Sequence, residues 1–411
     1  MMETVAEYGA APERANPAAN DLRPLLRSKV ISETALLLHC AEPIADLDSG
    51  LRMQVDRLTD HLIPLARHAS VAASLCQDPE NAPLYATAHL ILSQLGFPDP
   101  LFDELYREAL QLGPDFGADR LPYQRSQRRW LERVWPVRPL KQRRSAAGLS
   151  DTQLGRTLNV LSASRLDIYA FTHAVMFGTG FGAWPSPRVR SHRAVAADAD
   201  AALAFTVASA DHDLTAEVLM CFPMLRLPWS TTATFAFHVI TESQNAHGFL
   251  PGLAYDETEA RFLRGTALTE YVGATCYHPT YVMGMLCAVS VRTEHLPSTE
   301  VGPGSSTHGL GPVLFRLLRG TAVHGAWCRA LEKLTVAQQN ALAPMLFTVL
   351  ARHFTAEKAV ESLQSLLHLA LDADFLDGPV PMQSLAFLRR LKLLSRILTA
   401  ADAGSDRHEV V

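Results

Sequence analysis

The segment Ala208-Ser-Ala-Asp-His-Asp-Leu-Thr-Ala-Glu-Val-Leu-Met-Cys-Phe222 predicts an apolar helix with two acidic groups on one face. Asp213 and Glu217 are four residues apart, so an α-helix places both carboxylates on the same side. A carboxylate among so many apolar neighbours needs a partner, because burying an unpaired charge is costly. The partner is an arginine such as Arg165 or Arg226, a histidine or a metal ion.

Helical periodicity continues along almost the whole chain, and no β-hairpin signal occurs. Ser150 and Gln153 predict a capping box at the start of one helix, and the run Gly178-Thr-Gly-Phe-Gly182 predicts its end. Pro279 is predicted at the first position of a later helix, with His278 as its N-cap. The predicted helices cover residues 22–40, 51–69, 83–95, 98–112, 122–135, 151–177, 196–208, 211–222, 230–246, 257–275, 279–291, 310–331, 335–352, 356–372 and 381–399.

This pattern predicts an all-α fold class. Successive helices with few charges on one face pack in pairs, so we expect an α/α toroid, in which helical hairpins close into a barrel. An open α-solenoid is the alternative. The expected organisation is a disordered N-terminus (1–20), a single all-α domain (21–400) and a polar tail (401–411). Within that domain we separate N-terminal helices (21–145), central site-bearing helices (146–295) and C-terminal helices (310–400).

Composition excludes several functional classes. With 48% hydrophobic and 19% charged residues the chain is typical of soluble globular proteins, and a net charge of −5 argues against nucleic-acid binding. The longest apolar run, 281–291, is too short to span a membrane. The six cysteines form no Cys-x-x-Cys pair and no signal peptide is evident, so we expect a cytoplasmic protein. Motifs for a nucleotide cofactor or a serine hydrolase are missing.

Two distant histidines, His173 and His278, stand in apolar helical segments. In a toroid the C-terminal ends of one helical layer meet the N-terminal ends of the other at one mouth. We expect His173 at a C-terminal end and Asp213 and His278 at N-terminal ends, so these side chains converge there. Two imidazoles and two carboxylates form a ligand set for Zn²⁺ or Fe²⁺.

The predicted metal ligands are therefore His173, Asp213, Glu217 and His278, and the predicted catalytic residues are His173, Glu217 and His278. For each histidine alone, helix capping or core packing is the alternative interpretation. Cys221 and Cys276 lie in apolar surroundings, which favours inert core thiols over ligands.

One turn motif points to known toroids. The segment Gln244-Asn-Ala-His-Gly-Phe-Leu-Pro-Gly252 resembles the Gln-x-x-Asp-Gly-x-x-Pro-Gly turns that join helices in terpene-cyclase-like α/α toroids. His247 stands where these turns commonly have Asp.

A wider set of motifs resembles a family of bacterial all-α domains of unknown function, over about residues 120–290. The motifs, in order, are Leu121-Pro-Tyr-Gln with Trp130, Thr172-His-Ala-Val-Met-Phe177, Asp213-Leu-Thr-Ala-Glu217, the Gln244 turn and Tyr277-His-Pro-Thr-Tyr281. That family tends to have Asp-Phe-Gly where this chain has Gly180-Phe-Gly. The resemblance implies an all-α fold and a link to specialised-metabolite or modified-peptide biosynthesis, with no established activity.

Three functional hypotheses follow. The first is a metal-dependent enzyme of such biosynthesis, with a small-molecule or peptide substrate bound in the toroid mouth. The second is a non-catalytic scaffold that binds a peptide or partner protein through the basic segment Arg125–Arg144, whose default role is a solvated face. The third is a metal-free cyclase. The C-terminal helices (310–399) could complete the toroid or form a homodimer face.

Overall fold

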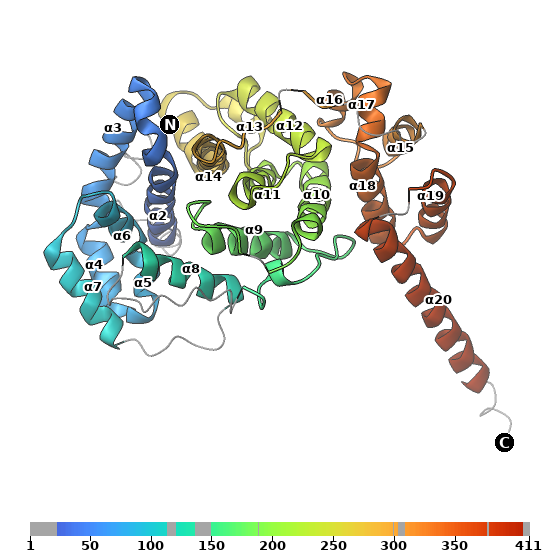
Figure 1. Ribbon diagram of the computed structural model, residues 1–411, viewed down its shortest axis with the longest axis horizontal. Helices are drawn as coiled ribbons and strands as arrows, with labels where there is room; N and C mark the ends of the chain where they lie inside the picture. Colours follow the sequence, from blue (N-terminus) through green and yellow to red (C-terminus); the bar gives the residue numbers. More distant parts are fainter. Residues whose placement is uncertain are drawn as a thin grey trace.

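The computed structural model describes residues 23–112, 121–135, 149–187, 189–298, 300–302, 309–375 and 378–405. These residues form helices and connecting turns without any strand, so the predicted all-α class is confirmed (Figure 1). The predicted disordered N-terminus (1–20) lies outside the described residues. The predicted polar tail (401–411) is partly described, and its first residues belong to the last helix.

The helices fall into three stretches of the chain. The first holds α2 (Arg23–Ala41), η1 (Glu42–Leu47), α3 (Ser49–Ala66), α4 (Ala69–Gln77), η2 (Pro79–Asn81), α5 (Ala82–Tyr85), α6 (Thr87–Gln94), α7 (Pro100–Leu112) and α8 (Pro122–Val134). The second holds η3 (Gln153–Gly155), α9 (Arg165–Thr179), α10 (His192–Ala208), α11 (His212–Leu225), α12 (Thr231–His247), α13 (Glu257–Phe262) and α14 (Gly265–Arg292). The third holds α15 (Leu310–Arg319), α16 (Cys328–Glu332), α17 (Val336–Ala341), α18 (Ala343–Ala356), α19 (Val360–Asp372) and α20 (Pro379–Ser405).

Helix α11 lies at the centre of the second stretch. It packs against α9, α10, α12 and α14, and every residue from Asp213 to Leu225 is buried (Figure 1). Burial of each large apolar side chain on such a helix contributes about 1.5–3 kcal/mol. This gain offsets the desolvation of the acidic groups that α11 carries inward. Helix α2 packs along α14, which brings the N-terminal part of the chain to the same region.

The ends of α9 and α11 have strong local signals. Ser164 and Asp167 form the capping box of α9, and Gly180 ends it in the left-handed conformation (φ 55°). Asp211 caps α11 by accepting a hydrogen bond from the backbone N–H of Leu214. These caps fix where the first turn of α11 lies relative to α9.

The predicted start of the helix 151–177 was wrong. Residues 153–155 form the short 3-10 helix η3, and α9 begins only at Arg165. A Cβ on Gly155 would lie 2.0 Å from the carbonyl oxygen of Ser150, so this segment folds back tightly on itself. The capping box at Ser164, which follows this segment in the chain, sets the helix start.

The predicted break before Pro279 was also wrong, since α14 runs unbroken from Gly265 to Arg292 with Pro279 inside it. A proline inside a helix leaves the carbonyl four residues earlier, here that of Thr275, without its usual N–H partner. The loop before α13 packs at this point, and its Leu250 N–H donates to Thr280 Oγ1. His278 therefore lies in the middle of a helix and is no N-cap.

A substitution of Gly252, which lies in that loop, tests this packing. A Cβ there would lie 2.2 Å from the carbonyl oxygen of Thr275. We expect Gly252→Ala to lower the free energy of unfolding by about 1–3 kcal/mol, because neither backbone segment can yield easily. In urea titrations Gly302→Ala, at a glycine with nothing within 4 Å, serves as the control and changes stability little. Equal effects of the two variants would contradict this close packing.

The C-terminal stretch differs from expectation in detail. The predicted helix 310–331 is two helices, α15 and α16, and the predicted helix 335–352 is divided between α17 and α18. Helix α20 extends to Ser405, beyond the predicted end at residue 399, and its C-terminal part projects away from the other helices (Figure 1). Among the described residues, no helix is long and apolar enough to cross a membrane.

Candidate metal centre

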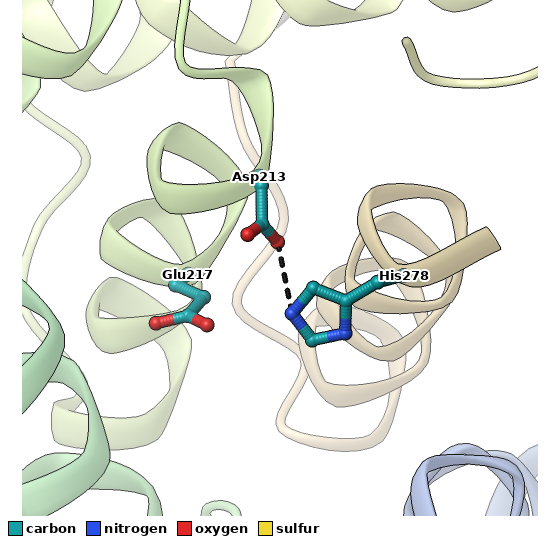
Figure 2. A group of neighbouring side chains, drawn as sticks. All are labelled: Asp213, Glu217 and His278. Atoms are coloured by element: carbon teal, nitrogen blue, oxygen red, sulfur yellow. Dashed lines mark ion pairs between the residues drawn. The ribbon is translucent and has the colours of Figure 1, made fainter. Parts of the chain in front are cut away.

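Helices α11 and α14 bring two carboxylates and one imidazole together (Figure 2). Asp213 lies in the first turn of α11, Glu217 follows one turn later, and His278 faces them from α14. One ligand atom from each residue lies within 4.8 Å of the others. His278 Nε2 is 3.2 Å from Asp213 Oδ1, close to the separation of about 3.4 Å between neighbouring ligand atoms in a tetrahedral zinc site.

Helix α2 supplies a further carboxylate that the sequence analysis missed. Glu33 Oε2 lies 2.9 Å from His278 Nδ1, on the side of the ring opposite to Nε2. Metal-binding histidines commonly have a carboxylate on their second nitrogen, which fixes the ring and makes it more basic. Lys29, one turn earlier on α2, lies 3.6 Å from Glu33. The only local signal for Glu33 was an acidic residue within an apolar stretch of helix.

Arg165 at the start of α9 is the arginine partner of the α11 acids. Its Nε lies 2.7 Å from Asp211 Oδ2, and its Nη2 lies 2.9 Å from Asp213 Oδ2. This contact leaves the second oxygen of Asp213, Oδ1, on the side of His278. Arg226, the other arginine considered, donates to the carbonyl of Thr293 instead.

His173 lies in the middle of α9, so its predicted place in the last turn was wrong. Its Nδ1 is 3.1 Å from the carbonyl oxygen of Tyr169 and 3.5 Å from Glu217 Oε2. His173 is not part of the group of converging ligand atoms, which contains only Asp213, Glu217 and His278 among the described residues. We therefore place His173 beside the cluster and omit it from the ligand set.

Several polar atoms of this cluster are buried without a hydrogen-bond partner. They are Glu33 Oε2, Asp213 Oδ1 and His278 Nδ1, in the part of the chain that the structure describes. The histidine contacts have ion-pair distances, but they do not have the direction of a hydrogen bond. Buried polar groups without partners are uncommon in folded proteins. Glu33 Oε2 and His278 Nδ1 face each other at 2.9 Å, so Asp213 Oδ1 is the atom to which a bound cation would be a further partner.

The protonation of the cluster follows from its burial and its charges. Burial, followed by the charge of Asp213, raises the pKa of Glu217 above its usual value. Burial also raises the pKa of Asp213, against the opposing effect of His278. Burial lowers the pKa of His278, but contact with Glu33 and the charge of Asp213 outweigh it and raise that pKa to about 9. Burial lowers the pKa of His173 to about 3, so this ring is neutral.

The charged groups in contact have a net charge of −2 when His278 is neutral. Four carboxylates face two cations in this cluster: Glu33, Asp211, Asp213 and Glu217 against Lys29 and Arg165. A divalent cation would neutralise the difference. Without one, protons on His278 and Glu217 do so, which agrees with the raised pKa values of both. Two carboxylates and one imidazole suit Zn²⁺, Fe²⁺ or Mn²⁺.

Thr172 links Glu217 to α9. Its Oγ1 lies 2.6 Å from Glu217 Oε2 and 3.0 Å from the carbonyl oxygen of Tyr169. A hydroxyl has one proton, so it can donate to only one of these two acceptors at a time. When the hydroxyl donates to Tyr169, a protonated Glu217 can donate to Thr172. The contact therefore accommodates either protonation state of Glu217.

Among the described residues, the other candidates do not belong to the group of converging ligand atoms, although Cys221 Sγ donates to the backbone carbonyl oxygen of Glu217. Cys221 and Cys276 are buried, and burial raises the pKa of both thiols, which favours the inert thiol form. In the basic segment, Arg128 pairs with Glu132 and Arg133 lies over the Trp184 ring. Four further basic residues of that segment, Arg138, Lys141, Arg143 and Arg144, lie outside the described residues.

Glu33 provides a test of the ring orientation. We expect Glu33→Ala to weaken Zn²⁺ binding by about 10–100-fold, because His278 loses the carboxylate on its second nitrogen. Lys29→Ala keeps the carboxylate on the ring and removes a cation that pairs with Glu33, so it should not weaken Zn²⁺ binding. Titration calorimetry measures both. Unchanged affinity in Glu33→Ala would show that this carboxylate does not support the ligand.

The fold and the cluster define a class: an all-α protein that buries a carboxylate–histidine centre between α2, α11 and α14. The chain belongs to a family described as a domain of unknown function (DUF6895), whose model matches residues 5–288. Membership of an uncharacterised family is thus confirmed, and the match starts earlier than the predicted residue 120. It includes Glu33, His173, Asp213, Glu217 and His278, while α15–α20 lie beyond it. No curated protein and no solved structure matches the chain significantly.

Proposed function

We propose that this protein is a metal-dependent enzyme whose divalent cation, Zn²⁺ or Fe²⁺, is held by Asp213, Glu217 and His278. The observation that carries the proposal is the convergence of three ligand atoms at a place where Asp213 Oδ1 is buried without a hydrogen bond. A divalent cation there would be a partner for that oxygen and would neutralise the net charge of −2. Bound metal would polarise a substrate or lower the pKa of a water molecule.

In this proposal Glu33 and Arg165 orient two of the metal ligands. Glu33 holds the imidazole of His278 with Nε2 toward the cation, and Arg165 holds Asp213 through Oδ2 so that Oδ1 is available. Three protein ligands leave further coordination positions for water or substrate, as catalytic sites require. A structural metal would more often have a closed set of four ligands.

The biological setting and the detailed architecture are part of the same proposal. A role in specialised-metabolite or modified-peptide biosynthesis, with a small-molecule or peptide substrate, rests on the resemblance of the motifs. A closed α/α toroid is supported by the Gln244–Gly252 turn, and an open α-solenoid is its alternative. A cytoplasmic location and a homodimer through the C-terminal helices are likewise proposals.

Elemental mass spectrometry of the full chain, purified untagged and without chelator, tests the proposal. We expect about one equivalent of zinc or iron in the wild type, and loss of that metal in Glu217→Gln. Asp198→Asn is the matched control, because Asp198 is also a buried carboxylate but pairs with Arg190 away from the centre. A wild-type protein that stays metal-free after incubation with Zn²⁺ and with Fe²⁺ would contradict the proposal and favour the scaffold or the metal-free cyclase.

A further inference from the structure

A stacked pair of rings borders the carboxylate cluster on α9. Tyr169 and His173 are one helical turn apart, and their ring centroids lie 3.6 Å from each other at an interplanar angle of 29°. Tyr123 of α8 packs edge-on against both rings. His173 also lies next to Glu217, with Nδ1 3.5 Å from Oε2. The rings are thus held in place from two helices, directly beside a proposed metal ligand.

The polar tips of this pair lack partners in the protein. Among the described residues, Tyr169 Oη and His173 Nε2 make no hydrogen bond, and neither belongs to the buried unpaired atoms. Neither ring is completely covered: both residues are half-buried, and the His173 side chain is 14% exposed. An ordered ring with an unpaired polar tip beside a cluster of acids is suited to contact a bound molecule.

The two tips offer opposite hydrogen-bonding roles. His173 Nδ1 lies 3.1 Å from the carbonyl oxygen of Tyr169, which can only accept, so Nδ1 has the proton and Nε2 is an acceptor. Burial, then the charge of Glu217, raises the pKa of Tyr169, so the phenol stays protonated and is a donor. The charges of Glu33 and Asp213 act in the same direction, which places this phenol in the field of the cluster.

We propose that Tyr169 and His173 bind the reacting group of the substrate beside the metal, and that this group is an amide. An amide offers a carbonyl oxygen for the phenol O–H of Tyr169 and an N–H for Nε2 of His173. An ester or a ketone would satisfy only the phenol. This inference rests on the proposed function, because it assigns the substrate class of the same centre.

Two metal-binding probes that differ at the nitrogen, N–H in one and N–CH3 in the other, test this assignment. Acetohydroxamate has a carbonyl oxygen and an N–H, whereas N-methylacetohydroxamate lacks the N–H. Titration calorimetry of the Zn²⁺-loaded full chain gives the affinity for each. Both Tyr169→Phe and His173→Phe keep an aromatic ring. Tyr169→Phe removes only the hydroxyl, whereas His173→Phe also removes Nδ1, which lies 3.5 Å from Glu217 Oε2, so metal content is measured on every sample.

We expect Tyr169→Phe to weaken both probes by about 3–10-fold, because both have the carbonyl oxygen. His173→Phe should weaken acetohydroxamate by a similar factor and leave N-methylacetohydroxamate unchanged. Tyr281→Phe is the control, since that hydroxyl contacts Thr34, and it should leave both affinities unchanged.

Metal-loaded variants with wild-type affinity for both probes would overturn the amide assignment and leave the metal centre intact. Equal losses for both probes in His173→Phe would also overturn it, because the N–H would then have no role. A wild-type chain that binds no metal would remove the proposed function itself, together with this inference.

Discussion

Replacing His278 by alanine is expected to weaken Zn²⁺ binding by more than about 100-fold and to leave the helical fold in place. Among the described residues, His278 supplies the only nitrogen of the three converging ligand atoms. Its loss leaves two neighbouring carboxylates, with Arg165 on Asp213 as their remaining cationic partner. The effect should exceed that of losing an outer carboxylate, which typically lies between 10-fold and 100-fold. Because His278 lies inside α14 and caps no helix, circular dichroism should remain close to that of the wild type.

A matched control separates ligation from general damage. His89 is also a buried histidine, and its Nε2 lies 2.8 Å from Asp103, but no third ligand converges there among the described residues. We expect His89→Ala to lower the melting temperature and to keep full metal binding. If His278→Ala kept its metal, or if both variants lost metal equally, the assignment of His278 as a ligand would be wrong.

The second large effect is the pH dependence of metal binding. The pKa of His278 is raised to about 9 and that of Glu217 is also raised, so near neutral pH both groups hold a proton that the metal must displace. Each displaced proton makes the affinity rise about tenfold per pH unit, so two protons give about 100-fold per unit. We expect the affinity to rise from pH 6 and to level off above about pH 9.

The metal-free protein should show the opposite trend in stability. The pKa of His278 is higher in the folded chain than its unperturbed value of 6.5, so its stabilising contribution is complete below pH 6.5 and is lost as pH rises toward about 9. The raised pKa of Glu217 acts in the same direction, because deprotonating a buried carboxyl destabilises the fold.

Melting curves between pH 6 and pH 9, with and without Zn²⁺, test the pH dependence together with proton release measured calorimetrically in two buffers. A metal-free melting temperature that rises over this range would contradict the protonation scheme. Binding without proton release would contradict it as well.

The sequence predicted the part of the centre that depends on local spacing. Asp213 and Glu217 share a face because they are four residues apart on a helix, and the apolar residues around them correctly indicated burial. His278 was named for its apolar surroundings, but its position was misjudged, because a proline after it usually marks a helix start. Here the long helix α14 continues through Pro279, beside the loop that contains Gly252.

Glu33 could not be predicted, for a physical reason. Its contact with His278 joins residues far apart in the sequence, and it depends on how α2 packs along α14. No periodicity within either helix contains that information. The start of α9 was misplaced for a related reason: Ser150 and Ser164 both have the sequence signal of a cap, and only the packing of the segment between them decides which one is used.

X-ray diffraction from crystals of the Zn²⁺-loaded full chain, recorded on both sides of the zinc absorption edge, tests the central claim most directly. The account predicts one strong anomalous peak about 2.0–2.2 Å from Asp213 Oδ1, a Glu217 carboxylate oxygen and His278 Nε2. An anomalous map without a peak at these atoms, with His278 and Asp213 still in direct contact, would show that the cluster is an ion-pair network and not a metal centre.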